Sequence, residues 1–261
     1  MMNWLYSVPE VLLIVVAAAL FAASVIFLPR YVQRVSFLKP TEPGFEFIIR
    51  MQAPLYTIAA LVLTFTLVEA ERNFRQIDAA LKAEASQINQ LDRLLARIDD
   101  PAAEACRPLL RSYVRSILQD EWPAMLKLGG ASDKTRLASA TMSRAILAID
   151  AQPGREQVIY GQIVRLLEAI GLSRDSRVDS LNVGLPAIYW FVLLFNVTML
   201  LLVTCAIPRT PFRTAVLSAQ LAVIGAFIAF VFIMDAPYRG DTTIKPGALV
   251  AVLAALEARN R

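Results

Sequence analysis

Four apolar stretches constrain the fold of this chain more than any other feature of its sequence. They cover residues 9–28, 53–68, 185–207 and 215–234. An α-helix rises about 1.5 Å per residue, so each stretch is close to the length that crosses a hydrocarbon core roughly 30 Å thick. A chain of 261 residues that is 57% hydrophobic and only 18% charged also suits a membrane protein. The sequence therefore predicts an all-α polytopic membrane protein with four transmembrane helices.

The first apolar stretch is interpreted as a retained span and not as a signal peptide. No Lys or Arg precedes it, whereas a signal peptide starts with a basic region. Ser7, Pro9 and Glu10 have the spacing of a helix N-cap with a capping box, in which the Glu side chain reaches back to the cap. We expect the first helix to begin at these residues.

A long polar segment between the second and third stretches carries helical periodicity. Apolar residues recur at steps of three and four along residues 74–98, with Glu84 in the place of one of them. No Pro or Gly lies between Leu55 and Asp100, so the second span and this helix are predicted to form one continuous rod. Further helices are expected after the pair Asp99 and Asp100, one of which would cap its helix, and near residues 133–149.

A last helix of this segment follows the turn at Gly154 and leads toward the third span. Its apolar face is predicted to contain Ile163, Leu166 and Ile170, and Arg177 continues the same stripe. Helices with one apolar stripe bury it against each other, so a helical bundle inserted between helices 2 and 3 is expected to face water. The predicted parts are residues 1–68 with spans 1 and 2 and a basic connecting loop, 69–183 with the soluble bundle, 184–236 with spans 3 and 4, and 237–261 with a tail and short amphipathic helix.

Residue usage excludes several kinds of site. There is no histidine, and the two cysteines, Cys106 and Cys205, are far apart in sequence. Cys–His zinc sites, His-ligated haem and His-dependent catalytic triads are therefore excluded. No nucleophile is paired with a base in a recognisable pattern, so we expect neither an enzyme nor a cofactor. The polar segment is nearly balanced in charge, which gives no surface for nucleic acid.

Glu84 breaks the apolar stripe of its helix and needs a partner, because an unpaired buried carboxylate is costly. Arg177 is one candidate partner, and Arg111 or Arg115 is the other. A structural clamp is the favoured role for Glu84. A gate or an ion-binding site is the alternative.

Polar side chains within the spans are candidates to line a hydrated path. They are Thr57 and Thr64 in the second span, Asn196 in the third and Gln220 in the fourth. The alternative is that these hydroxyl and amide groups join helices to one another, as such groups often do in membranes.

The fourth apolar stretch ends abruptly at a carboxylate. Asp235 can anchor at the membrane interface, Pro237 prevents the helix from continuing, and Gly240 permits a turn. Arg239 could bind a lipid phosphate or pair with Asp235. A purely structural stop is one interpretation of this segment, and a charged rim at the mouth of a pore is the other.

Three separated motifs resemble the bestrophin-like family of bacterial four-span membrane proteins. Their residues are Arg111, Tyr113, Glu121 and Trp122 in the polar segment, Pro186 and Trp190 at the start of the third span, and Asp235, Pro237 and Gly240 after the fourth. The resemblance implies kinship with bestrophins, which are pentameric anion channels whose helical soluble region lies in the cytoplasm. It also implies the inner membrane of a bacterial cell. No acidic calcium-binding clasp accompanies the motifs, so calcium gating does not carry over.

The charges that flank the spans favour the opposite orientation by a small margin. Arg30, Arg34, Lys39 and Arg50 lie in the loop between the first two spans, which the positive-inside rule places in the cytoplasm, so the bundle would face outward. The resemblance and the charge count thus disagree on the side of the bundle.

Two functions remain open at this point. One is a homo-oligomeric anion channel, a pentamer if the kinship holds, that conducts inorganic anions across a lipid bilayer along a path lined by the second and fourth spans. The other is a membrane-anchored sensor or interaction protein whose bundle binds a partner without transport.

Overall fold

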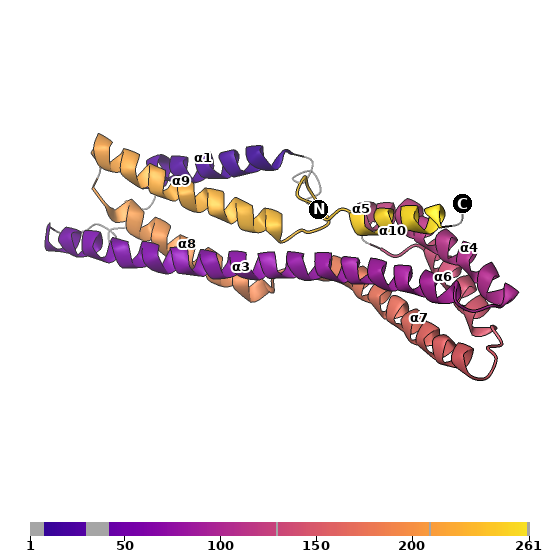
Figure 1. The fold of residues 1–261 in the computed structure, drawn as a ribbon. Helices are drawn as coiled ribbons and strands as arrows, with labels where there is room; N and C mark the ends of the chain where they lie inside the picture. Colours follow the sequence, from indigo (N-terminus) through magenta and orange to yellow (C-terminus); the bar gives the residue numbers. More distant parts are fainter. Residues whose placement is uncertain (1–7, 30–41, 129, 209, 260–261) are drawn as a thin grey trace. The chain divides into compact units, whose positions relative to one another are not determined.

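The computed structural model describes residues 8–29, 42–128, 130–208 and 210–259, and all regular secondary structure within them is helical (Figure 1). Four helices are long and apolar enough to cross a membrane: α1 (Glu10–Phe27), α3 (Glu42–Leu95), α8 (Ala187–Ala206) and α9 (Pro211–Met234). The prediction of an all-α chain with four candidate spans is confirmed. Ser7, Arg30, Arg34 and Lys39, which entered the arguments on capping and orientation, lie outside the described residues.

The contacts of the chain divide it into two compact units. Unit 1 combines Met1–Phe74 with Gly184–Thr243, and unit 2 combines Arg75–Val183 with Ile244–Arg261. Each unit therefore joins segments that are distant in the sequence. Helix α3 contributes residues to both units.

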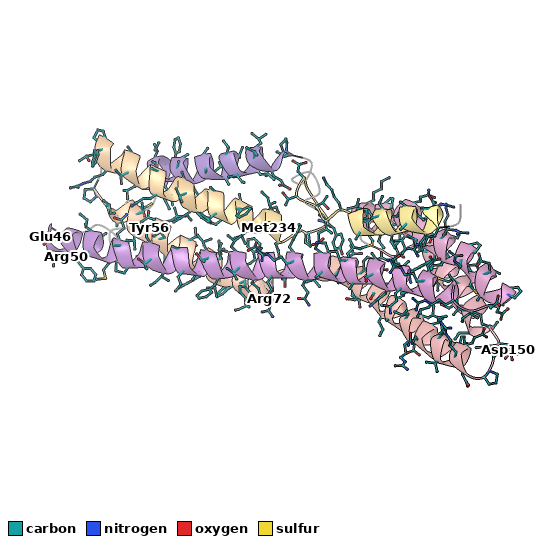
Figure 2. The ribbon with its side chains drawn as sticks, in the orientation of Figure 1. Glu46, Arg50, Tyr56, Arg72, Asp150 and Met234 are labelled. Carbon is teal, nitrogen blue, oxygen red and sulfur yellow. The ribbon has the colours of Figure 1, made fainter. Side chains whose placement is uncertain are left out.

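Helix α3 is continuous from Glu42 to Leu95, as the absence of helix breakers after Leu55 predicts. It begins before the second apolar stretch and includes Pro54, which lacks an N–H and so removes one hydrogen bond of the helix. Glu46, Arg50, Tyr56 and Arg72 follow one another along this helix (Figure 2). The span and the helix after it thus form one element.

Unit 1 is held together by the packing of α1 along α9 and by a shared apolar core (Figure 1). Gly225 of α9 allows close approach, because a Cβ added there would lie 2.7 Å from the carbonyl oxygen of Ala17. The Ser218 hydroxyl of α9 donates a hydrogen bond to the Ala22 carbonyl of α1 at 3.3 Å. Small residues and interhelical hydrogen bonds are the usual means of helix association in membranes.

Unit 2 contains the second part of α3 and a set of shorter helices. They are α4 (Pro101–Ser116), the π-helix η3 (Ile117–Glu121), α5 (Trp122–Leu128), α6 (Asp133–Leu147), α7 (Arg155–Asp179), the 3₁₀ turn η4 (Ser180–Asn182) and α10 (Gly247–Ala258). Of the two predicted cap candidates, Asp100 caps α4, since its carboxylate accepts the backbone N–H of Ala102 at 2.8 Å.

The core of unit 2 follows the predicted stripes with one correction. Ile77, Leu81, Ile88, Leu91 and Leu95 of α3 are buried. On α7 the buried series is Ile159, Ile163, Leu167 and Ile170, whereas Leu166, which was predicted on this face, is half-buried at its edge. At 3.6 residues per turn, positions 166 and 167 lie about equally far on either side of the line through Ile163 and Ile170, so helix periodicity alone does not choose between them.

Helix α10 closes the core of unit 2. Its residues Leu249, Val252 and Leu256 are buried, and Glu257 pairs with Arg115 of α4 at 2.7 Å. Arg115, one of the cations considered for Glu84, is thus engaged with the terminal helix.

Candidate functional site

A network of buried ion pairs lies inside unit 2. Arg177 of α7 donates two hydrogen bonds to Glu84 of α3, from Nε to Oε2 at 2.8 Å and from Nη2 to Oε1 at 3.2 Å. Its third nitrogen, Nη1, lies 2.9 Å from Oε1 of Glu121. Arg174, one turn earlier on α7, donates to Oε2 of Glu121 at 2.6 Å. Among the partners considered for Glu84, the structure thus selects Arg177.

The Nη1 contact of Arg177 is an ion pair without good hydrogen-bond geometry. The Nη1 hydrogen bond goes to the sulfur of Met125 at 3.4 Å, and Oε1 of Glu121 accepts no well-oriented hydrogen bond from the residues that the structure describes. Oε2 of Glu121 also accepts a long bond from the backbone N–H of Ser132 at 3.4 Å. Glu121 is therefore less fully satisfied than Glu84.

The network is balanced, with two carboxylates against two guanidinium groups, and all four side chains are buried. Burial by itself lowers the pKa of the Arg177 guanidinium, but contact with Glu84 and then with Glu121 outweighs it and holds this pKa above its ordinary value. Buried charges of this kind are tolerated only when each is paired. Arg177 therefore stays charged at every accessible pH.

Tyr113 of α4 lies beside the ion pairs and is completely buried. Burial raises its pKa above the ordinary value, and the carboxylate of Glu84 raises it further. Its hydroxyl has no hydrogen-bond partner among the described residues. A buried, unsatisfied hydroxyl is uncommon in folded proteins and marks Tyr113 as a residue that packing alone does not explain.

The π-helix η3 brings Glu121 into the network. A π-helix has more residues per turn than an α-helix, and the first and last residues of this one, Ile117 and Glu121, are both completely buried. Such turns occur frequently at functional sites. Neither η3 nor the role of Arg174 was predicted from the sequence, although Arg174 continues the buried stripe through Ile170 and could have been found from it.

Two other motif residues lie near this part of the chain. Trp122 is buried directly after η3. Arg111 of α4 is half-buried, and its Nη1 has no hydrogen-bond partner among the described residues. Within those residues there is also no group of three or more acidic or cysteine side chains placed to hold a metal ion.

A second cluster fastens the ends of helices in unit 1. Asp235 follows α9 and accepts the backbone N–H of Leu185 at 2.5 Å. The indole N–H of Trp190 on α8 also bonds to Asp235, and its ring meets Phe232 of α9 edge-on with centroids 6.3 Å apart. Pro186 is the N-cap of α8. Asp235 therefore joins the start of α8 to the end of α9.

Glu10 of α1 holds the chain that follows Asp235. The backbone N–H of Thr242 donates to Glu10 Oε1 at 2.7 Å, and its hydroxyl donates to Oε2. Gly240 has φ +80°, which favours glycine, and a Cβ there would lie 2.6 Å from Glu10 Oε1 and would displace that carboxylate. The predicted capping box involves Ser7, which lies outside the described residues; within them the cap position of α1 is Pro9, and no side chain makes a cap hydrogen bond there. The carboxylate is used by the tail instead.

The remaining residues of this motif differ in exposure. Pro237 is buried, and its carbonyl accepts the Thr243 hydroxyl at 3.3 Å, whereas Arg239 is exposed. The motif at the end of α9 is thus a folded turn with Arg239 on its surface.

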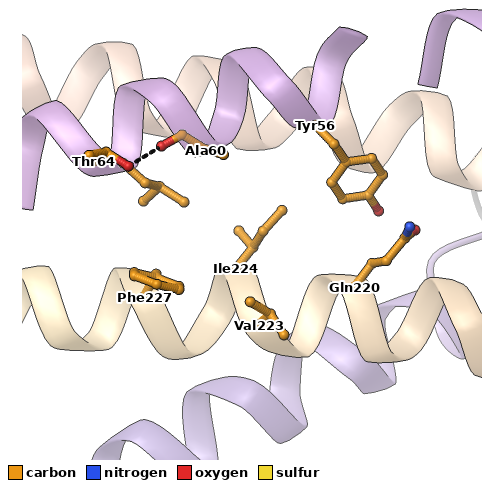
Figure 3. A pocket seen from close by; sticks show the side chains of 8 residues that line it. Tyr56, Ala60, Thr64, Gln220, Val223, Ile224 and Phe227 are labelled. Carbon is orange, nitrogen blue, oxygen red and sulfur yellow. Dashed lines mark hydrogen bonds between the residues drawn. The ribbon is translucent and has the colours of Figure 1, made fainter. Parts of the chain in front are cut away.

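The polar residues within the spans are dispersed. Thr57 and Thr64 are exposed on α3 and donate to the carbonyls of Ala53 and Ala60 at 3.0 and 2.7 Å. Asn196 is half-buried on α8. Thr64 and Gln220 line a pocket of about 320 Å³ between α3 and α9, where the Gln220 amide and the Tyr56 hydroxyl point toward each other (Figure 3).

Four membrane-length helices and their apolar core define a polytopic helical membrane protein. The family model of the bestrophin-like domain matches residues 16–249. The chain therefore belongs to the bestrophin-like family, as its three motifs indicated.

Solved structures of two membrane proteins share the fold. One is the crystal structure of a proline-to-alanine variant, with a TM-score of 0.63 at 11% identity, covering 95% of this chain and 97% of the other. The second is a glycine-to-alanine variant, with a TM-score of 0.58 at 13% identity, covering 94% and 95% of the two chains. No curated protein matches the sequence.

Proposed function

We propose that this chain assembles with copies of itself into an anion channel in a bacterial inner membrane, with α3 and α9 beside the conducting path. In this proposal residues 69–183 form a water-facing bundle, and the ion pairs between Glu84, Glu121, Arg174 and Arg177 keep that bundle rigid. Membership of the bestrophin-like family supports the proposal.

A polar stripe on the exposed face of α3 carries the proposal. Arg50, Thr57 and Thr64 follow each other at intervals of seven residues, so they lie on one face of the helix with a drift of roughly 20° per step. The Arg50 side chain is 78% exposed and pairs only loosely with Glu46, at 3.6 Å. By contrast, all exposed residues of α1 are apolar, as a surface facing lipid requires.

The chemistry of this stripe suits the passage of an anion. A threonine hydroxyl can rotate from the carbonyl of its own helix toward a passing ion and then return, which gives weak and reversible contacts. A guanidinium at the end of the stripe attracts anions. Gln220 adds an amide from α9 at the level of Tyr56 (Figure 3).

Ion flux into liposomes that contain the purified protein tests this proposal. We expect chloride flux from the wild type and a clear reduction in Thr57→Val/Thr64→Val. Thr198→Val is the matched control, because Thr198 is also exposed and donates to its own helix, to Leu194 O at 2.7 Å, but lies on α8. No flux from correctly inserted oligomers, or equal reduction by Thr198→Val, would refute the proposal.

A groove on unit 2 favours the second candidate, a membrane-anchored interaction protein. It lies between α4 and α6, measures about 280 Å³, and includes Leu109 and Leu137. Leu137 is 64% exposed beside Leu109, so this groove offers an apolar surface that a partner could cover. A purified protein that is folded and monomeric, and that gives no ion flux in liposomes, would favour this function over conduction.

A further inference from the structure

A polar pocket in unit 2 is separate from the buried ion pairs and from the spans. It measures about 360 Å³ and lies between α3 and α7. Its lining includes Ser86, Asn89, Gln90, Arg93 and Arg97 from the α3 side and Gln162 from α7. No carboxylate contributes to it, although unit 2 is rich in acidic residues.

The two arginines of this pocket have no partners for their guanidinium groups among the described residues. Arg93 lies in the last turn of α3, and Arg97 lies in the turn that follows it. Like charges four residues apart repel each other by a few tenths of a kcal/mol. A cation near the C-terminus of a helix also interacts favourably with the helix dipole. That interaction explains neither the presence of two arginines nor the cavity lined by hydrogen-bond donors. An anion between them would remove the repulsion.

The remaining polar groups add hydrogen-bond donors. The side-chain oxygen of Asn89 accepts a bond from Arg259, so its amide nitrogen remains unpartnered among the described residues. Arg259 also pairs with Asp92 at 2.5 Å, and Arg107 holds the other oxygen of Asp92 at 3.0 Å. Asp92, which precedes Arg93 in the sequence, is thus neutralised by two arginines, which leaves the pocket positive and rich in donors.

From this arrangement we infer that the pocket binds a small, doubly charged oxyanion of the phosphate or phosphate-monoester class. A guanidinium donates two parallel N–H groups to two oxygens of one phosphate, which a halide cannot match. Two such forks and the Asn89 amide can engage several oxygens of one ligand. The volume lies at the lower end of the range for small-molecule sites. The site does not depend on ion conduction.

Calorimetric titration of the full-length protein in detergent with inorganic phosphate tests the inference. We expect saturable binding of one phosphate per chain that equimolar chloride does not compete away. In Arg93→Gln/Arg97→Gln the Kd should rise at least about tenfold, equivalent to roughly 1.4 kcal/mol. The control pair Arg144→Gln/Arg155→Gln removes the same charge from exposed sites on α6 and α7 outside the pocket, and should change the Kd less than about twofold.

Three results would overturn the inference: no saturable binding to the wild type, equal weakening by both pairs of substitutions, or competition by chloride at equal concentration. A lipid phosphate is the other source of the same chemistry. Titration with inorganic phosphate in nanodiscs with and without phosphatidic acid distinguishes a soluble phosphate ligand from a lipid phosphate. Loss of phosphate binding in the nanodiscs that contain phosphatidic acid would overturn the assignment to a soluble ligand. Unfolding midpoints measured for all variants check that the pocket variant remains folded.

Discussion

The pairing of Glu84 with Arg177 gives the sharpest prediction. Glu84→Gln keeps the shape of the side chain but removes its charge, so the network of two carboxylates and two guanidinium groups acquires one uncompensated positive charge. It also replaces one acceptor of Arg177 with an amide donor. Breaking a buried pair costs about 3–5 kcal/mol, and we expect a value near the lower end, because Glu121 still contacts Arg177. For a chain of this size, that lowers the unfolding midpoint by roughly 6–12 °C.

The double variant Glu84→Gln/Arg177→Gln restores neutrality, because Glu121 and Arg174 then balance each other. Its free energy of unfolding should be higher than the sum of the two single-variant effects predicts, by a coupling energy of about 2–3 kcal/mol. Thermal unfolding of the four proteins in one detergent measures this. The exposed pair Asp78 and Lys82, 2.6 Å apart on the same helix, is the control, with an expected coupling of less than about 1 kcal/mol. Additive effects at Glu84 and Arg177 would show that the reasoning on buried charge is wrong.

Three further substitutions test other parts of the structure. Tyr113→Phe removes an unsatisfied hydroxyl and should leave stability unchanged or raise it by up to about 1 kcal/mol at pH 7. Because the folded-state pKa of Tyr113 is raised, its contribution is constant below about pH 10 and falls as pH rises above that value, so above about pH 10 the wild type should lose stability more steeply than Tyr113→Phe in matched melts. Gly225→Ala forces α1 away from α9 and should lower the midpoint by several degrees, equivalent to about 1–3 kcal/mol, and an unchanged midpoint would contradict the close approach to Ala17. Gly171→Ala lies within α7 with open space around it and should raise stability by about 0.4–1 kcal/mol, whereas a lower midpoint would show hidden crowding.

Hydrophobic patterning was sufficient to predict the spans and most of the core. The run without helix breakers after Leu55 predicted the continuity of α3, and the break in its apolar stripe identified Glu84 as a buried charge in need of a cation. These features are local, because they depend on the period of one helix.

Other features depend on contacts that no local pattern encodes. The π-helix shifts the register by part of a turn without a distinctive composition, so the inward position of Glu121 could not be predicted from helix periodicity. Glu10 and Thr242 are separated by almost the whole chain, and their contact follows from the packing of α1 against α9. The charged groups of unit 2 were visible in the sequence, but their pairing required three helices to be placed together.

The return of the C-terminal segment to unit 2 limits how the protein can be dissected. The polypeptide passes between the units near residues 74, 183 and 243, so any contiguous fragment that contains all of unit 2 also includes α8 and α9 of unit 1. A fragment that ends at Val183 lacks Leu249, Val252 and Leu256, and uncovers the apolar surface that they fill. Truncation after α9, or a fusion that displaces α10, would therefore damage the core of unit 2. Most residues of that core precede α10 by more than a hundred positions in the sequence.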